Sequence, residues 1–274
     1  MEKNTKIRPF LKWAGGKFRL LDRILPWLPE GNCLIEPYAG SGAVFLNTNY
    51  DRYILNDINP DLIHTYQYVK KKPAEFITQA RDFFHPKYNQ EKMYYALRDQ
   101  FNQTTDLTER AILFLYLNRH GYNGLCRYNQ KGGFNVPFGR YKNPYFPEKE
   151  IYAFAQKAKK ARFVCQDFKN VMQKAKTGNI IYCDPPYVPL SDTASFTQYA
   201  QTGFTETEQT TLAALAEDLQ KRNIITVISN HDTQFTRKLY RKANIKAFQQ
   251  KRYISCKTNE RNHAKELVAC FNVD

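Results

Sequence analysis

Short apolar runs that alternate with helical patterns constrain the fold of this 274-residue sequence more than any other feature. The runs typical of strands occupy residues 33–36, 53–57, 162–166, 179–183, 224–229 and 266–271. Helical patterns begin at 43–46 and cover 59–69, 206–221 and 233–242. A strand, a helix and a second strand in that order form a βαβ unit, whose two strands are parallel. The alternation therefore predicts an α/β fold in which helices wrap a mostly parallel sheet.

The alternation stops between residues 60 and 146. Helical patterns at 92–101 and 108–117 lead into a segment, 118–145, that is rich in Gly, Asn, Arg and Tyr and has no apolar periodicity. We interpret the interruption as an insertion between the second and third strands. The predicted organisation is one domain formed by residues 1–59 and 147–274, with a helical insertion at 60–146.

The composition is strongly basic. The sequence has 41 Lys and Arg residues against 26 Asp and Glu, which gives a net charge of +15. Such a charge favours a polyanionic partner, because Lys and Arg that neutralise phosphates release condensed counterions. A basic protein without a nucleic-acid partner fits the charge equally well. The aromatic residues, 15% of the chain, build cores and also stack against unpaired bases.

No apolar run approaches the roughly 20 residues that a membrane-spanning helix needs. The polar N-terminus, residues 1–8, is followed by no hydrophobic signal segment, so we expect a cytoplasmic protein without membrane contact. The six cysteines show no CxxC spacing, and the five histidines are scattered. We therefore expect reduced thiols, with Cys33, Cys165 and Cys183 in or beside buried strands, and no bound metal.

A glycine-containing turn follows the first predicted strand, with the sequence Glu-Pro-Tyr-Ala-Gly-Ser-Gly at 36–42. Gly40 and Gly42 allow a ligand to approach the backbone closely, and the next helix offers free N–H groups. The turn is neither GxGxxG nor a P-loop, so a dinucleotide or ATP is not supported. Asp57, at the end of the second strand, is placed to accept hydrogen bonds from the ribose of an adenosine, or to cap the following helix. Asp167, after the third strand, has the same two interpretations, with the adenine amino group as its ligand.

The fourth predicted strand runs directly into Asp184-Pro185-Pro186-Tyr187. Two prolines fix the backbone, and an acid at a strand end faces the ligand crevice. The Asp184 carboxylate and the Pro185 carbonyl would accept both hydrogens of an exocyclic amine, so that its lone pair points at a sulfonium methyl group. Tyr187 would stack on the target base after it leaves the helix. The tetrapeptide fits adenine N6 and cytosine N4 alike, and a proline-rich strand stop is the structural alternative.

These motifs resemble those of the Dam class of DNA adenine methyltransferases. The segments that match, in the same order, are 10–17, 36–42, 56–57, 117–129, 134–141, 184–187 and 229–233. The resemblance extends from residue 8 to 271, with small departures at Tyr38, Ala39 and His120. It implies a class I S-adenosylmethionine-dependent methyltransferase with a Rossmann-like sheet, whose insertion recognises double-stranded DNA. The family methylates adenine in the palindrome GATC, using S-adenosylmethionine as cofactor, and we expect a monomer.

The resemblance also implies roles for individual residues. It gives Trp13, Lys17, Asp57 and Asp184 as cofactor contacts. Together with the interpretations of the residues above, the expected cofactor contacts are Trp13, Lys17, Glu36, Gly40, Gly42, Asp57, Asp167 and Asp184, and the expected catalytic residues are Asp184, Pro185 and Tyr187. Arg127 matches an arginine that reads a guanine with two hydrogen bonds, and Lys12 a second guanine reader. Tyr122 and Asn123 match residues that wedge into the base stack. Leu125, Pro137 and Tyr141 match residues that, in the family, contact the inner bases of the recognised site.

Two alternatives remain on sequence grounds. One is amine methylation of another target: cytosine N4, RNA or a protein glutamine amide, although amide methylation usually accompanies Asn-Pro-Pro-Tyr and here Asp184 stands first. The other is a DNA-binding protein that has lost activity, against which the intact Asp184, Tyr187 and glycine turn argue. Both a housekeeping enzyme and one paired with a restriction enzyme fit the sequence.

Overall fold

The protein, described here by a computed structural model for residues 6–187, 204–251 and 263–271, is built on a mostly parallel sheet. The described strands are β1 (Cys33–Glu36), β2 (Arg52–Asn56), β3 (Ala161–Val164), β4 (Asn179–Cys183), β5 (Ile225–His231), β6 (Asn244–Lys251) and β7 (His263–Phe271). Their order in the sheet is β3-β2-β1-β4-β5-β7-β6. The first five are parallel neighbours, whereas β7 is antiparallel to both β5 and β6. The predicted α/β fold class is confirmed.

Helices cover both faces of the sheet, which explains why its strands are continuous apolar runs. Successive strand residues point to opposite faces, so Leu34 packs in a core with α2, α3 and α7, whereas Cys33 and Ile35 pack in a second core with α8 and α9. These helices are α2 (Ala43–Leu46), α3 (Pro60–Lys71), α7 (Glu148–Ala158), α8 (Phe168–Gln173) and α9 (Glu206–Lys221). A strand buried on one side only would alternate polar and apolar residues instead.

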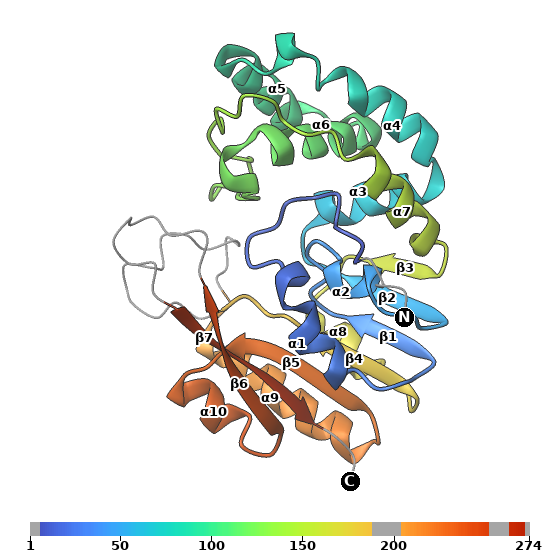
Figure 1. Cartoon of the computed structure of the whole chain (residues 1–274), viewed down its shortest axis with the longest axis vertical. Helices are drawn as coiled ribbons and strands as arrows, with labels where there is room; N and C mark the ends of the chain where they lie inside the picture. Colours follow the sequence, from blue (N-terminus) through green and yellow to red (C-terminus); the bar gives the residue numbers. More distant parts are fainter. Residues whose placement is uncertain (1–5, 188–203, 252–262, 272–274) are drawn as a thin grey trace.

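The remaining helices are mostly short or lie in the inserted region. They are η1 (Lys17–Leu20), α1 (Leu21–Ile24), η2 (Leu25–Trp27), α4 (Pro73–Asp82), η3 (Pro86–Tyr88), α5 (Glu91–Gln103), α6 (Leu107–His120), η4 (Tyr122–Gly124) and α10 (Gln234–Leu239). Figure 1 shows α4, α5 and α6 stacked at one end of the molecule, with α3 and α7 between them and the sheet. None of the helices in the described ranges has the length and apolar character needed to cross a membrane.

Helix α6 forms the centre of the inserted region. Its last ten residues, 111–120, are all buried, because α3, α4 and α5 pack around it. A helix that is apolar on every side is stable only in such a position. A buried ion pair also ties it to α3: the Arg110 guanidinium binds the Asp61 carboxylate, which accepts a further 2.6 Å hydrogen bond from the Tyr128 hydroxyl. The inserted helices and one face of the sheet therefore share one hydrophobic core.

Several elements differ from the sequence prediction. Helix α6 includes residues 118–120, which were predicted to be irregular, and α10 ends at Leu239 rather than 242. Helices α4, α7 and α8 and strand β6 were not predicted. Among the described strands, β6 pairs with β7 alone. It is rich in Lys and Gln, a composition that suits a sheet edge but lacks the apolar pattern by which a strand is predicted. Cys165 is exposed just after β3, not buried as expected; Cys256 lies outside the described residues.

The aromatic core beneath α7 yields a stability prediction. The Phe154 ring packs against four others, those of Phe10, Phe45, Tyr66 and Phe163. Phe154→Ala leaves a cavity that rigid strands cannot fill, so it should lower the free energy of unfolding by about 3–5 kcal/mol. Urea denaturation measures this loss. The control is Tyr152→Ala on the same helix, where the side chain is 42% exposed and the expected change is within about 0.5 kcal/mol. Equal losses in both variants would contradict the packing role.

Candidate functional site

The candidate site lies where the strand order of the sheet reverses. From β1 the chain proceeds to β2 and β3 on one side, then returns to β4 and β5 on the other. Ligands of open α/β sheets bind at the carboxyl ends of the strands at such a point. Glu36 ends β1, Asp57 follows β2 and Asp184 follows β4. Three of the predicted acids therefore meet at one edge of the sheet.

The N-terminal segment brings two further predicted residues to this edge. The Trp13 ring lies so close to Gly40 that a Cβ atom there would be 3.0 Å from the indole nitrogen. Gly40 also has a φ of +46°, which favours glycine. The Lys17 ammonium lies 2.8 Å from an Asp184 carboxylate oxygen and donates to the Gly15 carbonyl at 2.7 Å. Residues from three separate sequence motifs thus surround one position.

Asp57 holds the glycine turn in place. One carboxylate oxygen accepts a 3.0 Å hydrogen bond from the Gly40 amide, and the other accepts one of 3.0 Å from the Asn59 amide. Asn59, not Asp57, caps α3, because its side chain accepts from the first amides of that helix. The capping alternative for Asp57 is therefore wrong. For Asp167 it is confirmed, since this carboxylate caps α8 by accepting from the Lys169 amide at 2.9 Å; its cofactor contact stays a prediction.

The buried acids at this edge fit a positively charged adenosine derivative such as S-adenosylmethionine. Burial raises the pKa of Glu36 well above its usual range, and the nearby charge of Asp184 adds to the effect. The Oε1 atom of Glu36 has no hydrogen-bond partner among the described residues. Burial also raises the pKa of Asp57, although backbone amides oppose the shift. A cationic ligand with ribose hydroxyls would supply what these carboxylates lack.

Sequence reasoning missed one residue of this region. Ile58 follows Asp57 directly, yet its side chain is 67% exposed. An exposed isoleucine beside a carboxylate placed for a ribose offers an apolar surface for the attached base. The sequence contained a signal for this residue, because Ile58 directly follows Asp57, the polar residue that ends the predicted strand 53–57.

The Asp184 carboxylate is held by two partners from different parts of the chain. Besides Lys17, the Ser229 hydroxyl donates to it at 3.1 Å and also contacts the Tyr182 hydroxyl at 2.9 Å. Burial raises the pKa of Asp184, while Lys17 and Ser229 oppose the shift. Burial lowers the pKa of Lys17, but Asp184, Tyr182 and Glu266 together outweigh it, and the pKa lies above its usual value. Lys17 therefore stays protonated and favours the ionised form of the acid.

Tyr187 is fixed from three sides. Its ring centroid lies 4.2 Å from that of His231, the Lys17 ammonium lies 4.8 Å from it, and its hydroxyl donates to Glu266 at 3.4 Å. Pro185 is buried between these groups and the strand. Among the described residues, no protein donor is seen on the Pro185 carbonyl. The arrangement places two acceptors and one ring in a fixed geometry, as recognition of a planar base with an exocyclic amine requires.

A second cluster gathers most of the residues predicted to contact DNA. The Lys12 ammonium lies 4.0 Å from the centroid of the Tyr141 ring, and the Tyr141 hydroxyl accepts from the Asn123 amide at 2.9 Å. The Tyr122 amide donates to the Pro137 carbonyl at 2.9 Å. Tyr122 is 49% exposed, and Asn123 has a left-handed φ of +53°. An exposed ring on a strained turn suits a residue that inserts between bases.

Arg127 lies further along the same loop and is held differently. Its Nε atom donates to the Asn135 side chain at 2.8 Å and Nη2 to the Asn135 carbonyl at 3.2 Å. The partly exposed guanidinium is therefore oriented before any ligand binds. Leu125, between this arginine and the turn, is partly buried against the core. Burial and the charge of Arg119 lower the pKa of Lys12 to about 8, so an anionic or acceptor-rich partner would favour its protonated form.

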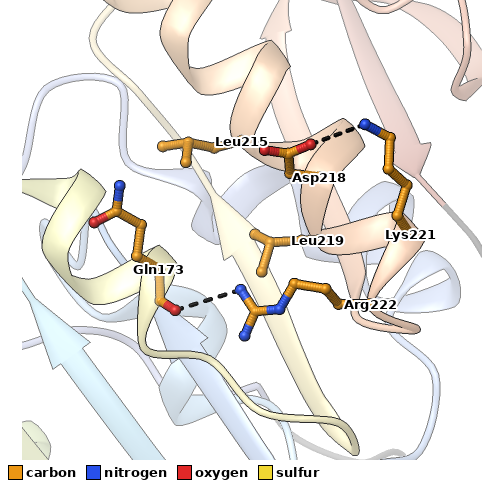
Figure 2. Close-up of a pocket in the computed structure, with 6 residues that line it drawn as sticks. All are labelled: Gln173, Leu215, Asp218, Leu219, Lys221 and Arg222. Carbon is orange, nitrogen blue, oxygen red and sulfur yellow. Dashed lines mark hydrogen bonds and ion pairs between the residues drawn. The ribbon is translucent and has the colours of Figure 1, made fainter.

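Two hollows of the described surface lie away from the candidate site. Figure 2 shows one of about 300 Å³, lined by residues of α8 and α9 and their ends: Gln173, Leu215, Asp218, Leu219, Lys221 and Arg222. A second, of about 420 Å³, lies near residues 25–31 and 47–50. Neither contains a predicted site residue. Within the described ranges, no cluster of three or more His, Cys, Asp or Glu residues is arranged to hold a metal ion.

The comparisons with known proteins agree with this geometry. A family model, that of the D12 class N6 adenine-specific DNA methyltransferases, matches residues 13–254. The chain is 52% identical over 271 residues to a DNA adenine methylase of Escherichia coli K12, covering 99% of this chain and 96% of that protein. It is 52% identical over 272 residues to one of Serratia marcescens, covering 99% of this chain and 100% of that protein.

A related DNA adenine methylase of Vibrio cholerae is 51% identical over 267 residues, covering 97% of this chain and 96% of that protein. Among solved structures, a precorrin 8w decarboxylase of Methanobacterium thermoautotrophicum aligns over 93% of this chain and 89% of that chain. The identity is 10% and the TM-score 0.37, too low to carry an argument.

The hydrogen bond from Ser229 to Asp184 gives a prediction that titration can test. Ser229→Ala removes a donor that favours the ionised carboxylate, so the pKa of Asp184, already raised by burial, should rise further. Carboxyl carbon shifts of labelled aspartate followed against pH measure it. Thr226→Val is the control, because Thr226 is buried on the same strand but has no described bond to Asp184. An unchanged or lower pKa in Ser229→Ala would contradict the assigned contact.

Proposed function

This chain belongs to the D12 class of N6 adenine-specific DNA methyltransferases, and on that premise we propose that it methylates adenine in GATC sites of duplex DNA after extruding the base. It is a DNA methyltransferase acting on adenine N6, with S-adenosylmethionine as methyl donor. The observation that carries the proposal is the meeting of Asp184, Pro185 and Tyr187 with the glycine turn and Asp57 at one edge of the sheet.

Asp184 and Pro185 would bind the amine that is to be methylated. The adenine N6 lone pair is delocalised into the ring, so the nitrogen is a poor nucleophile. Two acceptors at fixed positions, the Asp184 carboxylate and the Pro185 carbonyl, would hold both N–H groups and favour a tetrahedral nitrogen. As positive charge develops there, the ionised carboxylate stabilises it. Lys17 occupies one carboxylate oxygen in this structure, at 2.8 Å, so the incoming amine would use the other oxygen or displace the ammonium.

The cofactor would lie along the glycine turn. Bound S-adenosylmethionine supplies an electrophilic methyl group on its sulfonium. Asp57 would accept from the ribose, Gly40 and Gly42 would allow the close approach, and Trp13 and Ile58 would provide apolar walls. Glu36 would face the positive charge of the ligand, and Asp167 its adenine amino group. Because Asp57 already accepts from the Gly40 amide, ribose binding and turn geometry are linked.

DNA recognition would be carried out by the inserted region, residues 60–146, between two parts of a catalytic domain, 1–59 and 147–274. Arg127 is oriented by Asn135 for a guanine edge, and Lys12, stacked on Tyr141, would read a second guanine. Tyr122 and Asn123 would enter the base stack, while Leu125 and Pro137 would contact the inner bases. The net charge of +15 would attract the phosphate backbone. We also propose that the protein acts on DNA as a monomer, in the cytoplasm.

Replacing the catalytic carboxylate tests the chemical step. Asp184→Ala should lower the single-turnover rate of methyl transfer by well over about tenfold, because a charge-assisted contact at the reacting amine contributes on the order of 2 kcal/mol or more. Tritium transfer to DNA, followed by identification of the modified base, measures both rate and product. Asp218→Ala, at an exposed position on α9, is the control and should match the wild-type rate. A labelled cytosine or an undiminished Asp184→Ala rate would refute the assignment.

Replacing Arg127 tests the proposed base readout. A bidentate contact to guanine is worth about 1–3 kcal/mol of discrimination, so Arg127→Ala should methylate sites altered at one guanine position almost as well as GATC. Duplexes with single substituted base pairs, scored by single-turnover rates, measure the effect. Lys131→Ala in the same loop is the control and should change all sequences alike or none. A uniform loss across the panel for Arg127→Ala would mean that this residue contacts the backbone.

A further inference from the structure

The catalytic tetrapeptide cannot be held by ordinary backbone hydrogen bonds. Pro185 and Pro186 lack N–H groups, so the turn that carries them has two donors fewer than other turns. Its position must come from contacts to its carbonyls and side chains. Asp184 has Lys17 and Ser229, as described above. The peptide that follows, between Pro186 and Tyr187, requires a separate contact.

That contact comes from helix α9. The Gln209 side-chain amide donates a 3.0 Å hydrogen bond to the Pro186 carbonyl. Gln209 is fully buried, with an exposed fraction of 0%, although it is a long polar side chain in the first turns of a helix. A buried amide is tolerated only when its polar atoms are paired. Burying the Gln209 amide therefore costs free energy unless the amide is paired. Its nitrogen is paired with the Pro186 carbonyl of the turn.

The orientation of this amide is fixed by two neighbours. Its oxygen accepts from the Asn230 side chain at 3.0 Å and from the Tyr240 hydroxyl at 3.2 Å. Asn230 also donates to the Tyr240 hydroxyl at 2.9 Å, which closes a triangle of buried groups. Because the oxygen has two donors, the nitrogen must face Pro186. Such a closed network in a low-dielectric interior holds one geometry.

We propose that Gln209 is a positioning residue for methyl transfer, which sets the Pro186–Tyr187 peptide and through it the Tyr187 ring and the Pro185 carbonyl. The proposal rests on the roles proposed above for Pro185 and Tyr187. Rotation of this peptide would move the ring that stacks on the target base and the carbonyl that binds its amine. Gln209 itself touches neither base nor cofactor. It acts on the rate through the geometry of the turn.

The test compares Gln209→Met with a matched control. Gln209→Met keeps length and burial but removes both the donor to Pro186 and the acceptor of Asn230 and Tyr240, so the single-turnover rate should fall at least about tenfold, as displacements near 1 Å can cost more than that. Affinity for S-adenosylmethionine and for DNA should stay within about twofold of wild type, since the ligand contacts lie elsewhere. The control is Tyr50→Phe, which removes a buried 2.5 Å hydrogen bond to the Pro29 carbonyl before β2, at the opposite edge of the sheet. Tyr50→Phe should retain the wild-type rate.

Two outcomes overturn the proposal. One is a Gln209→Met rate equal to that of Tyr50→Phe; the other is a loss explained by weaker ligand affinity alone. An assay of the wild-type enzyme in parallel distinguishes a failure of the role proposed for Gln209 from a failure of the proposed function. If it methylates adenine while Gln209→Met is equally fast, only the role of Gln209 fails. If the wild type transfers no methyl group to adenine, both fail.

A second variant decides the matter if Gln209→Met does not fold. Gln209→Glu keeps the shape and the acceptor, but it donates to Pro186 only while its carboxyl group is protonated. Burial raises the pKa of that carboxyl group, whereas the donors Asn230 and Tyr240 lower it, so the pH range in which it ionises is first located from its labelled carboxyl carbon shift. The ratio of variant to wild-type rate should therefore fall as the pH rises. A ratio that stays constant while the carboxyl group ionises overturns the proposal, and so does a ratio equally low in both of its forms.

Discussion

The ion pair between Lys17 and Asp184 joins two distant segments of the sequence that form the site. Lys17 is almost completely buried, and burying two charges costs several kcal/mol each unless further hydrogen bonds satisfy them. Those bonds are present: the ammonium also donates to the Gly15 carbonyl, and the carboxylate accepts from Ser229. The N-terminal segment is thereby fixed to the end of β4. This pair therefore connects the segment that carries Trp13, proposed to form a cofactor wall, to the Asp184 carboxylate.

The same N-terminal segment is fixed on its other side to the inserted helices. The Asn118 side chain binds both the amide and the carbonyl of Lys12, at 2.8 and 2.7 Å, and the Arg119 guanidinium donates to the Phe10 carbonyl. Both residues are buried at the end of α6. Residues 10–17 therefore connect the proposed DNA-reading loop with the proposed catalytic carboxylate.

The carboxyl groups of the candidate site contrast with the net positive charge of the whole chain. Burial raises the pKa values of Glu36, Asp57 and Asp184, which all lie at one edge of the sheet. The excess of 41 basic over 26 acidic residues instead favours a polyanion at the surface. A cationic methyl donor and an anionic nucleic acid are thus attracted to different places.

The sequence by itself determined the strands, their acidic ends and the chemistry of 36–42 and 184–187, because each of these signals is local. It did not indicate β6 or the end of α6, where tertiary packing outweighs weak local preferences. The cofactor contacts and base readers assigned from the family resemblance stay predictions. Only the tertiary structure brought Lys17 to Asp184, Ser229 to the same carboxylate and Gln209 to Pro186. The first of these contacts spans well over half of the chain. The physical reason is that pairing of buried polar groups depends on which strands and helices become neighbours, and no periodicity in the sequence records that.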